Sequence, residues 1–389
     1  MQHRKWFVLI TLYLFLGRAG ARDMQSFNDA WKFARFGPMP DGSLLVEPQG
    51  LEKADFDDSA WRILDVPHDW GIEGPFRAGL PNRTGKLPWA GIGWYRKTFM
   101  SPASDAGKRV YIDFDGAMSG TAVWLNGQPI GEWPYGYASF RFELTEHLKV
   151  GQANTLAVRL DNKAESSRWY PGGGIYRNVR LVKTGPVHIA YWGVFVITPQ
   201  VSPQAATVDI KTTIEGETKG LELRHELYTQ AAQPQQVGTA TVKAGATCQI
   251  EIRNPRLWDL EHPRLYRVQT TLLRDGDVID TYETSFGIRT IEYNGHQGFL
   301  LNGKRVRMNG VCPHHDLGPL GTAVHTRALE RQIEILQSMG CNAIRTSHNP
   351  PASELLDLCD RMGMLVQVEA FDAWARQKAP NDYARHFKA

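Results

Sequence analysis

Two short apolar segments near the end of the chain constrain its fold more than any other feature. They span residues 341–345 and 363–368, and each leads into an ionisable side chain, Arg345 in the first case and Glu369 in the second. A helix is predicted between them, over residues 352–362. A strand, a helix and a second strand in this order give two parallel strands whose carboxyl ends share one rim, as in a (β/α)8 barrel.

The residues before these segments repeat the pattern. Residues 306–311 are predicted to form the first barrel strand, followed by a helix with Thr326 as N-cap and Gly340 at its end. The inner faces of the two helices are expected to contain Leu329, Ile333, Leu336 and Met339 in the first, and Leu355, Leu356 and Cys359 in the second. We therefore expect residues 291–389 to be the N-terminal part of a TIM barrel, truncated after three of its eight strands.

The rest of the chain has the pattern of two β domains. Residues 22–185 contain many short alternating segments, with a hairpin signal at Asn126-Gly127, and are predicted to form a jelly roll. Residues 186–290 alternate again, turn at Asp275-Gly276, and fit an immunoglobulin-like β-sandwich. The predicted fold class is thus multidomain: a jelly roll, an immunoglobulin-like sandwich and the start of a TIM barrel.

The first 21 residues are typical of a signal peptide. His3–Lys5 are basic, Trp6–Leu16 are apolar, and Ala19–Ala21 form an A-x-A cleavage site. The apolar run is too short to span a bilayer as a helix. We expect a secreted or periplasmic protein without a membrane attachment after cleavage; the alternative is an uncleaved membrane anchor.

Charge and cysteine usage exclude some classes of protein. A net charge of +3 over 389 residues does not imply a nucleic-acid partner. Four cysteines in a chain of this length do not suggest a disulfide framework. Cys341 and Cys359 are instead expected to be small buried hydrophobic residues.

Polar side chains follow each of the three predicted barrel strands. His314 follows the first strand, Arg345 and His348 follow the second, and Glu369 ends the third. In a barrel these junctions share the rim that carries the active site, and Arg, His and carboxylate groups suit a hydroxylated ligand. The alternative is an ordinary polar rim that caps helices and completes turns.

No metal or phosphate motif accompanies these residues. His314 and His315 are adjacent, so their side chains diverge if the backbone is extended. The sequence contains no H-E-x-x-H pair, no G-x-S-x-G elbow and no Walker loop. We predict no metal and no cofactor.

A series of motifs resembles the family 2 glycoside hydrolases, in particular their secreted bacterial β-galactosidase-like members. In chain order the motifs are Val66–Trp70, Gly93–Phe99, Val123–Gly127, Ser167–Pro171, Gly174–Arg177, Pro255–Trp258, Phe286–Arg289, Asn309–Val311, Asn342–Pro350 and Leu358–Gly363. The resemblance implies a sugar-binding jelly roll, an immunoglobulin-like domain and a TIM barrel. It also implies hydrolysis of terminal β-linked sugars, with β-galactosides as the first candidates; glucuronide and mannoside members share these motifs.

The resemblance also implies the residues that contact the sugar. They are His314, Arg345, His348 and Glu369 on the barrel, with Asp161 reaching in from the jelly roll. Glu369 matches a non-catalytic glutamate of the family, and no Asn-Glu pair of the kind that carries the acid/base follows residue 291. Ala373 and Ala375 stand where some members bind magnesium. No catalytic residue and no metal ligand is therefore assigned.

These observations predict an N-terminal portion of a retaining glycoside hydrolase that is inactive by itself and lacks both catalytic glutamates. Two alternatives stay open at this point. One is a carbohydrate-binding protein that has no catalytic activity, and the other is a fragment that has no function.

Overall fold

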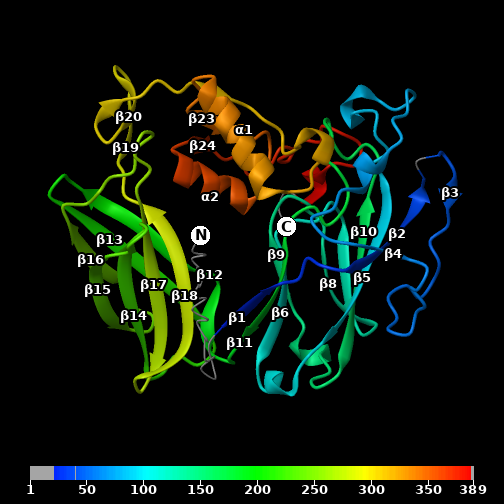
Figure 1. The fold of residues 1–389 in the computed structure, drawn as a ribbon, viewed down its shortest axis with the longest axis horizontal. Coiled ribbons are helices and arrows are strands. Elements are labelled where there is room, and N and C mark those ends of the chain that lie inside the picture. The colour runs from blue at the N-terminus through cyan, green and yellow to red at the C-terminus, as the bar shows by residue number, and fades with distance from the viewer. Residues whose placement is uncertain (1–21, 40, 387–389) are drawn as a thin grey trace, which may run out of the picture.

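The structure is a computed structural model that describes residues 22–39 and 41–386. The predicted signal peptide lies outside these residues. Two β-sandwiches stand side by side, and a smaller α/β unit lies above the gap between them (Figure 1). The predicted fold class is confirmed. Within the described part of the chain, no helix is long and apolar enough to cross a membrane.

The first sandwich consists of a four-stranded and a seven-stranded antiparallel sheet. The four-stranded sheet has the order β1 (Asp23–Ser26), β11 (Val179–Thr184), β6 (Arg109–Phe114) and β9 (Phe140–Glu143). The other has the order β3 (Leu44–Leu45), β2 (Trp31–Pro38), β5 (Gly91–Met100), β10 (Ala153–Asn162), β7 (Thr121–Leu125) and β8 (Gln128–Trp133), with β4 (Arg62–Leu64) beside β2. Alternate residues such as Val123 and Leu125 face the core between the sheets. Asn126 and Gly127 both have positive φ and form the predicted hairpin turn.

The second sandwich has three strands facing four. One sheet contains β12 (His188–Val201), β13 (Ala205–Glu215) and β16 (Cys248–Arg253). The other contains β15 (Gln236–Lys243), β14 (Leu221–Thr229), β17 (Leu265–Arg274) and β18 (Asp277–Gly287). Alternating residues, among them Val208, Ile210 and Val268, pack in the core as the sequence pattern predicts. The turn at Asp275-Gly276 joins β17 to β18.

His225 of β14 is fully buried in this second core and carries a testable consequence. Burial lowers the pKa of His225 to about 4, and its Nδ1 lies 3.0 Å from Thr270 Oγ1. The unfolded chain binds a proton near pH 6.5, whereas the folded domain resists protonation down to about pH 4. Stability should therefore be constant above pH 6.5 and fall between pH 6.5 and 4, by about 3 kcal/mol from this residue.

Urea unfolding of the full chain at pH 7.0, 5.5 and 4.5 tests this expectation. His225→Gln cannot be protonated in this range, so the variant should be less stable at pH 7 but lose less stability on acidification. His315 also has a depressed pKa and remains in both proteins, so the difference between the two slopes isolates His225. Equal slopes would contradict the assignment.

The α/β unit contains a short antiparallel sheet, a parallel sheet and two helices. β19 (Ile291–Asn294), β20 (Gly298–Leu301) and β21 (Lys304–Arg305) form the former, and β22 (Gly310–Val311), β23 (Ala343–Arg345) and β24 (Leu365–Gln367) the latter. The helices are α1 (Thr326–Ser338) and α2 (Ser353–Met362). Ile344 packs with the helices, while Ala343 and Leu365 pack on the other face against Trp258. Both faces are covered, as expected for a parallel sheet.

Several sequence-based details of this unit were wrong. The strands are shorter than predicted, and Cys341 precedes β23 and is half-buried. Met339 is 69% exposed because it is the C-cap, where the chain turns away through Gly340. His325 is the N-cap of α1 in place of Thr326. On α2, Leu358 is buried and Leu356 is not.

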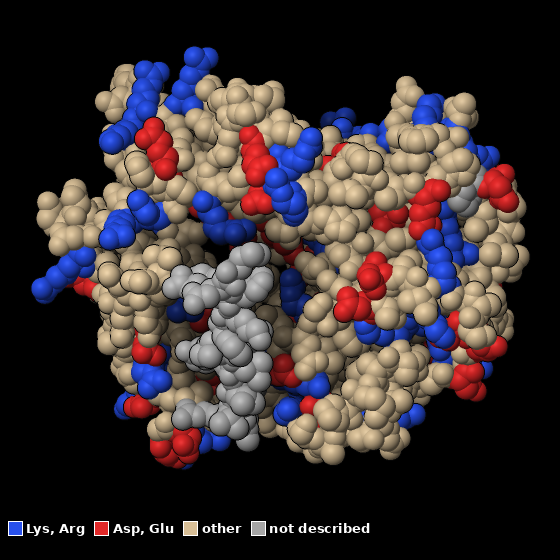
Figure 2. Space-filling view, viewed as in Figure 1, with Lys and Arg blue, Asp and Glu red and all other residues tan. Residues whose placement is uncertain are grey.

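Charges of both signs are interspersed over the face shown in Figure 2, without a large patch of either sign. The four cysteines are free thiols.

Candidate functional site

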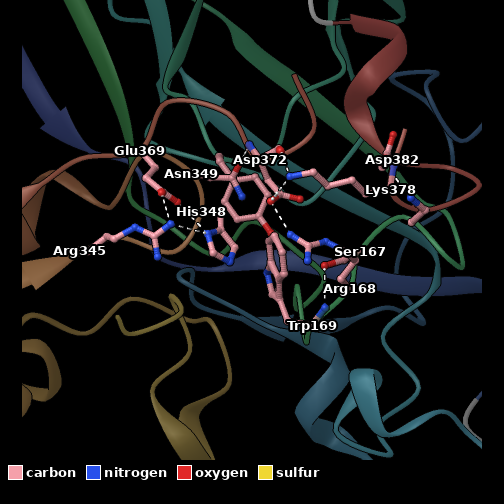
Figure 3. Close-up of polar contacts among 12 residues, drawn as sticks. Ser167, Arg168, Trp169, Arg345, His348, Asn349, Glu369, Asp372, Lys378 and Asp382 are labelled. Atoms are coloured by element: carbon pink, nitrogen blue, oxygen red, sulfur yellow. Dashed lines mark hydrogen bonds and ion pairs between the residues drawn. The ribbon is translucent and has the colours of Figure 1, made fainter. Parts of the chain in front are cut away.

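Three polar side chains meet at the carboxyl ends of β23 and β24. Arg345 ends β23 and donates through Nη2 to Glu369 Oε1, and His348 Nδ1 lies 2.7 Å from Glu369 Oε2 (Figure 3). Because a carboxylate only accepts hydrogen bonds, Nδ1 of His348 carries the proton here and Nε2 is the ring nitrogen left for a ligand. Thr346 Oγ1 accepts from the Glu369 backbone at 3.0 Å and fixes the start of this segment.

A second cluster beside the first connects the barrel unit to the jelly roll. Arg168, in the loop after β10, donates to Asp372 Oδ1 at 2.6 Å. Lys378 Nζ lies 3.1 Å from the same oxygen. The indole of Trp169 packs against the rings of His314 and His348, with centroids 4.8 and 5.2 Å away. The jelly-roll loop therefore packs against both histidines of the barrel rim, and Figure 3 shows Trp169 beside His348.

The charged residues of the two clusters and His348 line an open pocket of about 440 Å³. Its lining consists of Arg168, Arg345, His348, Val368, Glu369, Ala370, Phe371, Asp372, Trp374 and Lys378. Charged donors and acceptors can bind hydroxyl groups, and aromatic side chains offer apolar faces to the C–H groups of a sugar ring. The volume lies within the usual range for small-molecule sites.

The structure brings together most of the predicted site residues. Arg345, His348 and Glu369 line the pocket, and His314 lies behind it with its ring centroid 5.5 Å from that of His348. Asp161 does not reach the pocket. Its carboxylate lies 3.5 Å from Arg159 Nη1 on the same strand, whereas its neighbour Asn162 is buried and donates to Gly172 O at 2.6 Å. Alternation along β10 sends the two side chains to opposite faces.

Sequence reasoning missed the jelly-roll residues that do reach the site. Arg168 and Trp169 belong to the Ser167–Pro171 motif, which was noticed only as part of a resemblance. Asp372 and Lys378 follow the last predicted strand in a segment without periodicity. An Arg and a Trp side by side in a loop directly after a long strand could have indicated that this loop contributes to a binding site.

The two adjacent histidines have different roles. Their side chains diverge as predicted: His314 faces Trp169, whereas His315 packs against Tyr137 and Tyr176. Burial lowers the pKa of His315 to about 3, so it stays neutral and donates through Nε2 to Pro171 O at 3.0 Å. Burial, aided by the charge of His348, also lowers the pKa of His314. Among the described residues, no group of three or more His, Cys, Asp or Glu side chains could hold a metal ion.

A separate cavity of about 350 Å³ lies between α1, α2 and the jelly roll. Its lining is dominated by apolar side chains such as Leu329, Ile333 and Leu355. A sugar needs several hydrogen-bonding partners, so the pocket at Arg345 and Glu369 is the better candidate site.

Comparison with known proteins covers nearly the whole described chain. Three family models match successive regions: "Glycosyl hydrolase 2 galactose-binding domain-like" at residues 82–170, "Glycosyl hydrolases family 2" at 187–289 and "Glycosyl hydrolases family 2, TIM barrel domain" at 293–378.

Individual relatives are similar over the same length. Beta-galactosidase BoGH2A of Bacteroides ovatus is 45% identical over 94% of this chain and 43% of its own length. A putative beta-glucuronidase of Formosa agariphila is 40% identical over 97% of this chain and 36% of its own. The crystal structure of a glycosyl hydrolase family 2 member from Bacteroides cellulosilyticus superimposes with a TM-score of 0.85 at 36% identity, covering 94% of this chain and 48% of that one. The chain spans less than half the length of these relatives.

Proposed function

Because the chain belongs to glycosyl hydrolase family 2, we propose that its pocket binds the terminal sugar of β-linked glycosides, with β-galactosides as the first candidates. The observation that carries this proposal is the Arg345–Glu369–His348 cluster, which opens into the pocket. The side chains of these residues are 24–37% exposed, so a ligand can reach them. Two similar relatives bear the names of a galactosidase and a glucuronidase, so the sugar itself is part of the proposal.

The cluster suits a sugar because each group keeps hydrogen-bonding capacity after pairing. Glu369 uses one site on each oxygen for Arg345 and His348, and a carboxylate has about four such sites. Two neighbouring hydroxyl groups can therefore donate to Glu369. The remaining N–H groups of Arg345 and the Nε2 of His348 can complete the contacts. The ion pair also fixes the carboxylate before the ligand arrives, which lowers the entropic cost of binding.

Hydrolysis of a glycoside with retention needs two carboxylates about 5–5.5 Å apart, one as acid/base and one as nucleophile. The pocket carboxylates are Glu369 and Asp372, and each is held by two cationic or imidazole partners. In this arrangement the oxygens of both carboxylates accept hydrogen bonds from neighbouring side chains of the pocket. We assign both carboxylates to binding and positioning, and none of the described residues to the chemical step.

The family membership and this pocket support two forms of the function. The first is the sugar-binding part of a retaining β-glycoside hydrolase that acts in carbohydrate metabolism outside the cytoplasm, consistent with the leader-like residues 1–21. The second is a carbohydrate-binding protein without catalysis, which the engagement of both pocket carboxylates favours. Both forms require that the pocket binds sugar.

Replacement of Arg345 tests the binding role. Arg345→Ala should weaken binding of methyl β-galactoside by about 10–100-fold, because a hydrogen bond to a charged group is worth about 1.5–3 kcal/mol. Isothermal titration calorimetry of the purified chain gives the dissociation constant, and parallel titrations with methyl β-glucuronide and β-mannoside identify the preferred sugar.

Arg361→Ala is the matched control, since Arg361 is an exposed arginine in the last turn of α2 that donates through Nε to Asp357 O at 3.3 Å and does not line the pocket. The control should bind like the parent chain. An Arg345→Ala variant that binds the preferred sugar with unchanged affinity would place the sugar site elsewhere.

A further inference from the structure

One buried carboxylate outside the pocket connects three segments that lie far apart in the sequence. Asp69 is 1% exposed and precedes the 3-10 turn η1 (Trp70–Glu73) of the jelly roll. Its Oδ1 accepts from the backbone nitrogens of Gly71 at 2.9 Å and Gly173 at 3.0 Å. The first bond caps the turn, and the second holds the loop that follows Trp169.

The other oxygen of Asp69 reaches across to the barrel unit. Oδ2 accepts from the Tyr170 hydroxyl at 2.9 Å, from Thr322 N at 2.9 Å and from Thr322 Oγ1 at 3.1 Å. Thr322 lies in the segment between β22 and α1, which also carries His314. One carboxylate therefore accepts five hydrogen bonds and joins the loop of Arg168 and Trp169 to the segment of His314.

Glycines let the backbone close around this carboxylate. A Cβ at Gly321 would lie 2.3 Å from Asp69 Oδ2, and one at Gly172 would lie 2.0 Å from Thr322 Oγ1 and 2.9 Å from Asp69 Oδ2. Both glycines also have positive φ, at 59° and 73°, which disfavours side chains. Both segments thus approach Asp69 so closely that no larger residue fits, as expected of a junction whose geometry is fixed.

We propose that Asp69 is a positioning residue of the sugar pocket, which sets the distance between the jelly-roll loop and the barrel rim. The expected effect of Asp69 on sugar binding rests on the proposed function of the pocket. Asp69 does not line the pocket, so it acts through others: Trp169 packs on His314 and His348, and Arg168 holds Asp372. If the junction loosens, the loop that carries Arg168 and Trp169 moves relative to Arg345 and Glu369.

The chemistry of the junction makes Asp69→Asn a sharp test. The side chain of Asn has the same shape, but its amide nitrogen is a donor. If the nitrogen replaces Oδ2, the N–H of Thr322 loses its acceptor; if it replaces Oδ1, the N–H groups of Gly71 and Gly173 lose theirs. Either orientation leaves at least one buried backbone donor without an acceptor. The junction is then destabilised by the desolvation cost of that donor.

Three measurements on the full chain test the proposal: the dissociation constant for methyl β-galactoside, the NMR titration of the His314 imidazole, and the urea unfolding midpoint. The His314 signal is assigned with His314→Gln. In Asp69→Asn we expect at least a tenfold loss of affinity. We also expect the pKa of His314 to rise toward its ordinary value, because Trp169 no longer shields the ring from water.

Asp105→Asn is the matched control for a purely structural effect. Asp105 is also buried in the jelly roll, where it contacts Ser101 and Lys183 and is remote from the pocket residues. This variant should lower the unfolding midpoint but leave the His314 titration and the affinity unchanged. If Asp69→Asn fails to fold, Thr322→Val removes one hydroxyl donor at nearly constant shape and should shift both site measurements in the same direction by a smaller amount.

The outcomes separate the two proposals. If the parent chain binds none of the tested sugars, the proposed function fails, but the His314 titration still decides the role of Asp69. A folded Asp69→Asn chain with the His314 titration of the parent would overturn the positioning role. So would an Asp105→Asn chain in which His314 shifts as much as in Asp69→Asn.

Discussion

The purified 389-residue chain should release no detectable nitrophenol from p-nitrophenyl β-galactoside. Retaining glycosidases use two carboxylates for the chemical step. Because enzymes typically accelerate their reactions by at least about 10⁶-fold, a chain without this pair should react too slowly for product to be detected. In the pocket of this chain, Glu369 is held by Arg345 and His348, and Asp372 by Arg168 and Lys378. We therefore expect these groups to bind a sugar without forming and releasing a glycosyl-enzyme intermediate.

The measurement needs a control for traces of host enzyme. Glu369→Gln, purified in the same way, provides it, because contamination gives equal rates in both preparations. Binding of methyl β-galactoside by the same batch shows that the pocket is folded. Turnover by the parent chain that disappears in Glu369→Gln would show that Glu369 is catalytic and would overturn our assignment of roles.

The sequence predicted those parts of the fold that depend on local patterns. Alternation in β7 and β13 and the turn at Asn126-Gly127 follow from which residues must face a core and which can adopt positive φ. The arrangement of Arg345, His348 and Glu369 could also be predicted, because parallel strands end at a common rim. At these positions the topology of a parallel sheet was enough to place the residues near one another.

Contacts between modules could not be predicted in the same way. The bond from Thr322 to Asp69 joins residues 253 apart in the chain, and the bond from Arg168 to Asp372 joins residues 204 apart. No periodicity connects such positions. The resemblance to the family implied that Asp161 reaches the sugar, yet the pleat of β10 turns its side chain toward Arg159. The jelly-roll side of the pocket is built by a loop, and loop conformation follows from packing that a single sequence does not reveal.

The predicted ends of the helices and strands were wrong for a related reason. Met339 fits the helical spacing of Leu336, but α1 ends at Ser338, and the chain reverses through Gly340 before its apolar side chain can reach the core. Periodicity identifies a face of a helix, whereas the end of the helix depends on the competing turn.

The parallel sheet should exchange its backbone amide protons much faster than the jelly roll. β22, β23 and β24 contain only two or three residues each, and β24 has a strand partner on one side only within the described chain. By contrast, β6 has six residues and is flanked by β11 and β9. Short strands with an open edge open locally at a lower free energy than a core strand.

We expect the amides of residues 341–345 to be at least about 100-fold less protected than those of residues 110–114, which corresponds to a difference of about 3 kcal/mol in opening free energy. Native-state hydrogen exchange on a monodisperse monomer measures both regions in one sample. The amides of β10, flanked by β5 and β7, provide the internal reference for a fully paired strand. Addition of the polypeptide that follows the matched region in the Bacteroides ovatus relative should raise protection in β24 and at 341–345 but not at 110–114, because we expect a further strand to pair with the open edge of β24. Equal protection in the two regions of the chain by itself would show that the three strands are stable without such a partner, and the view of an open sheet would have to be abandoned.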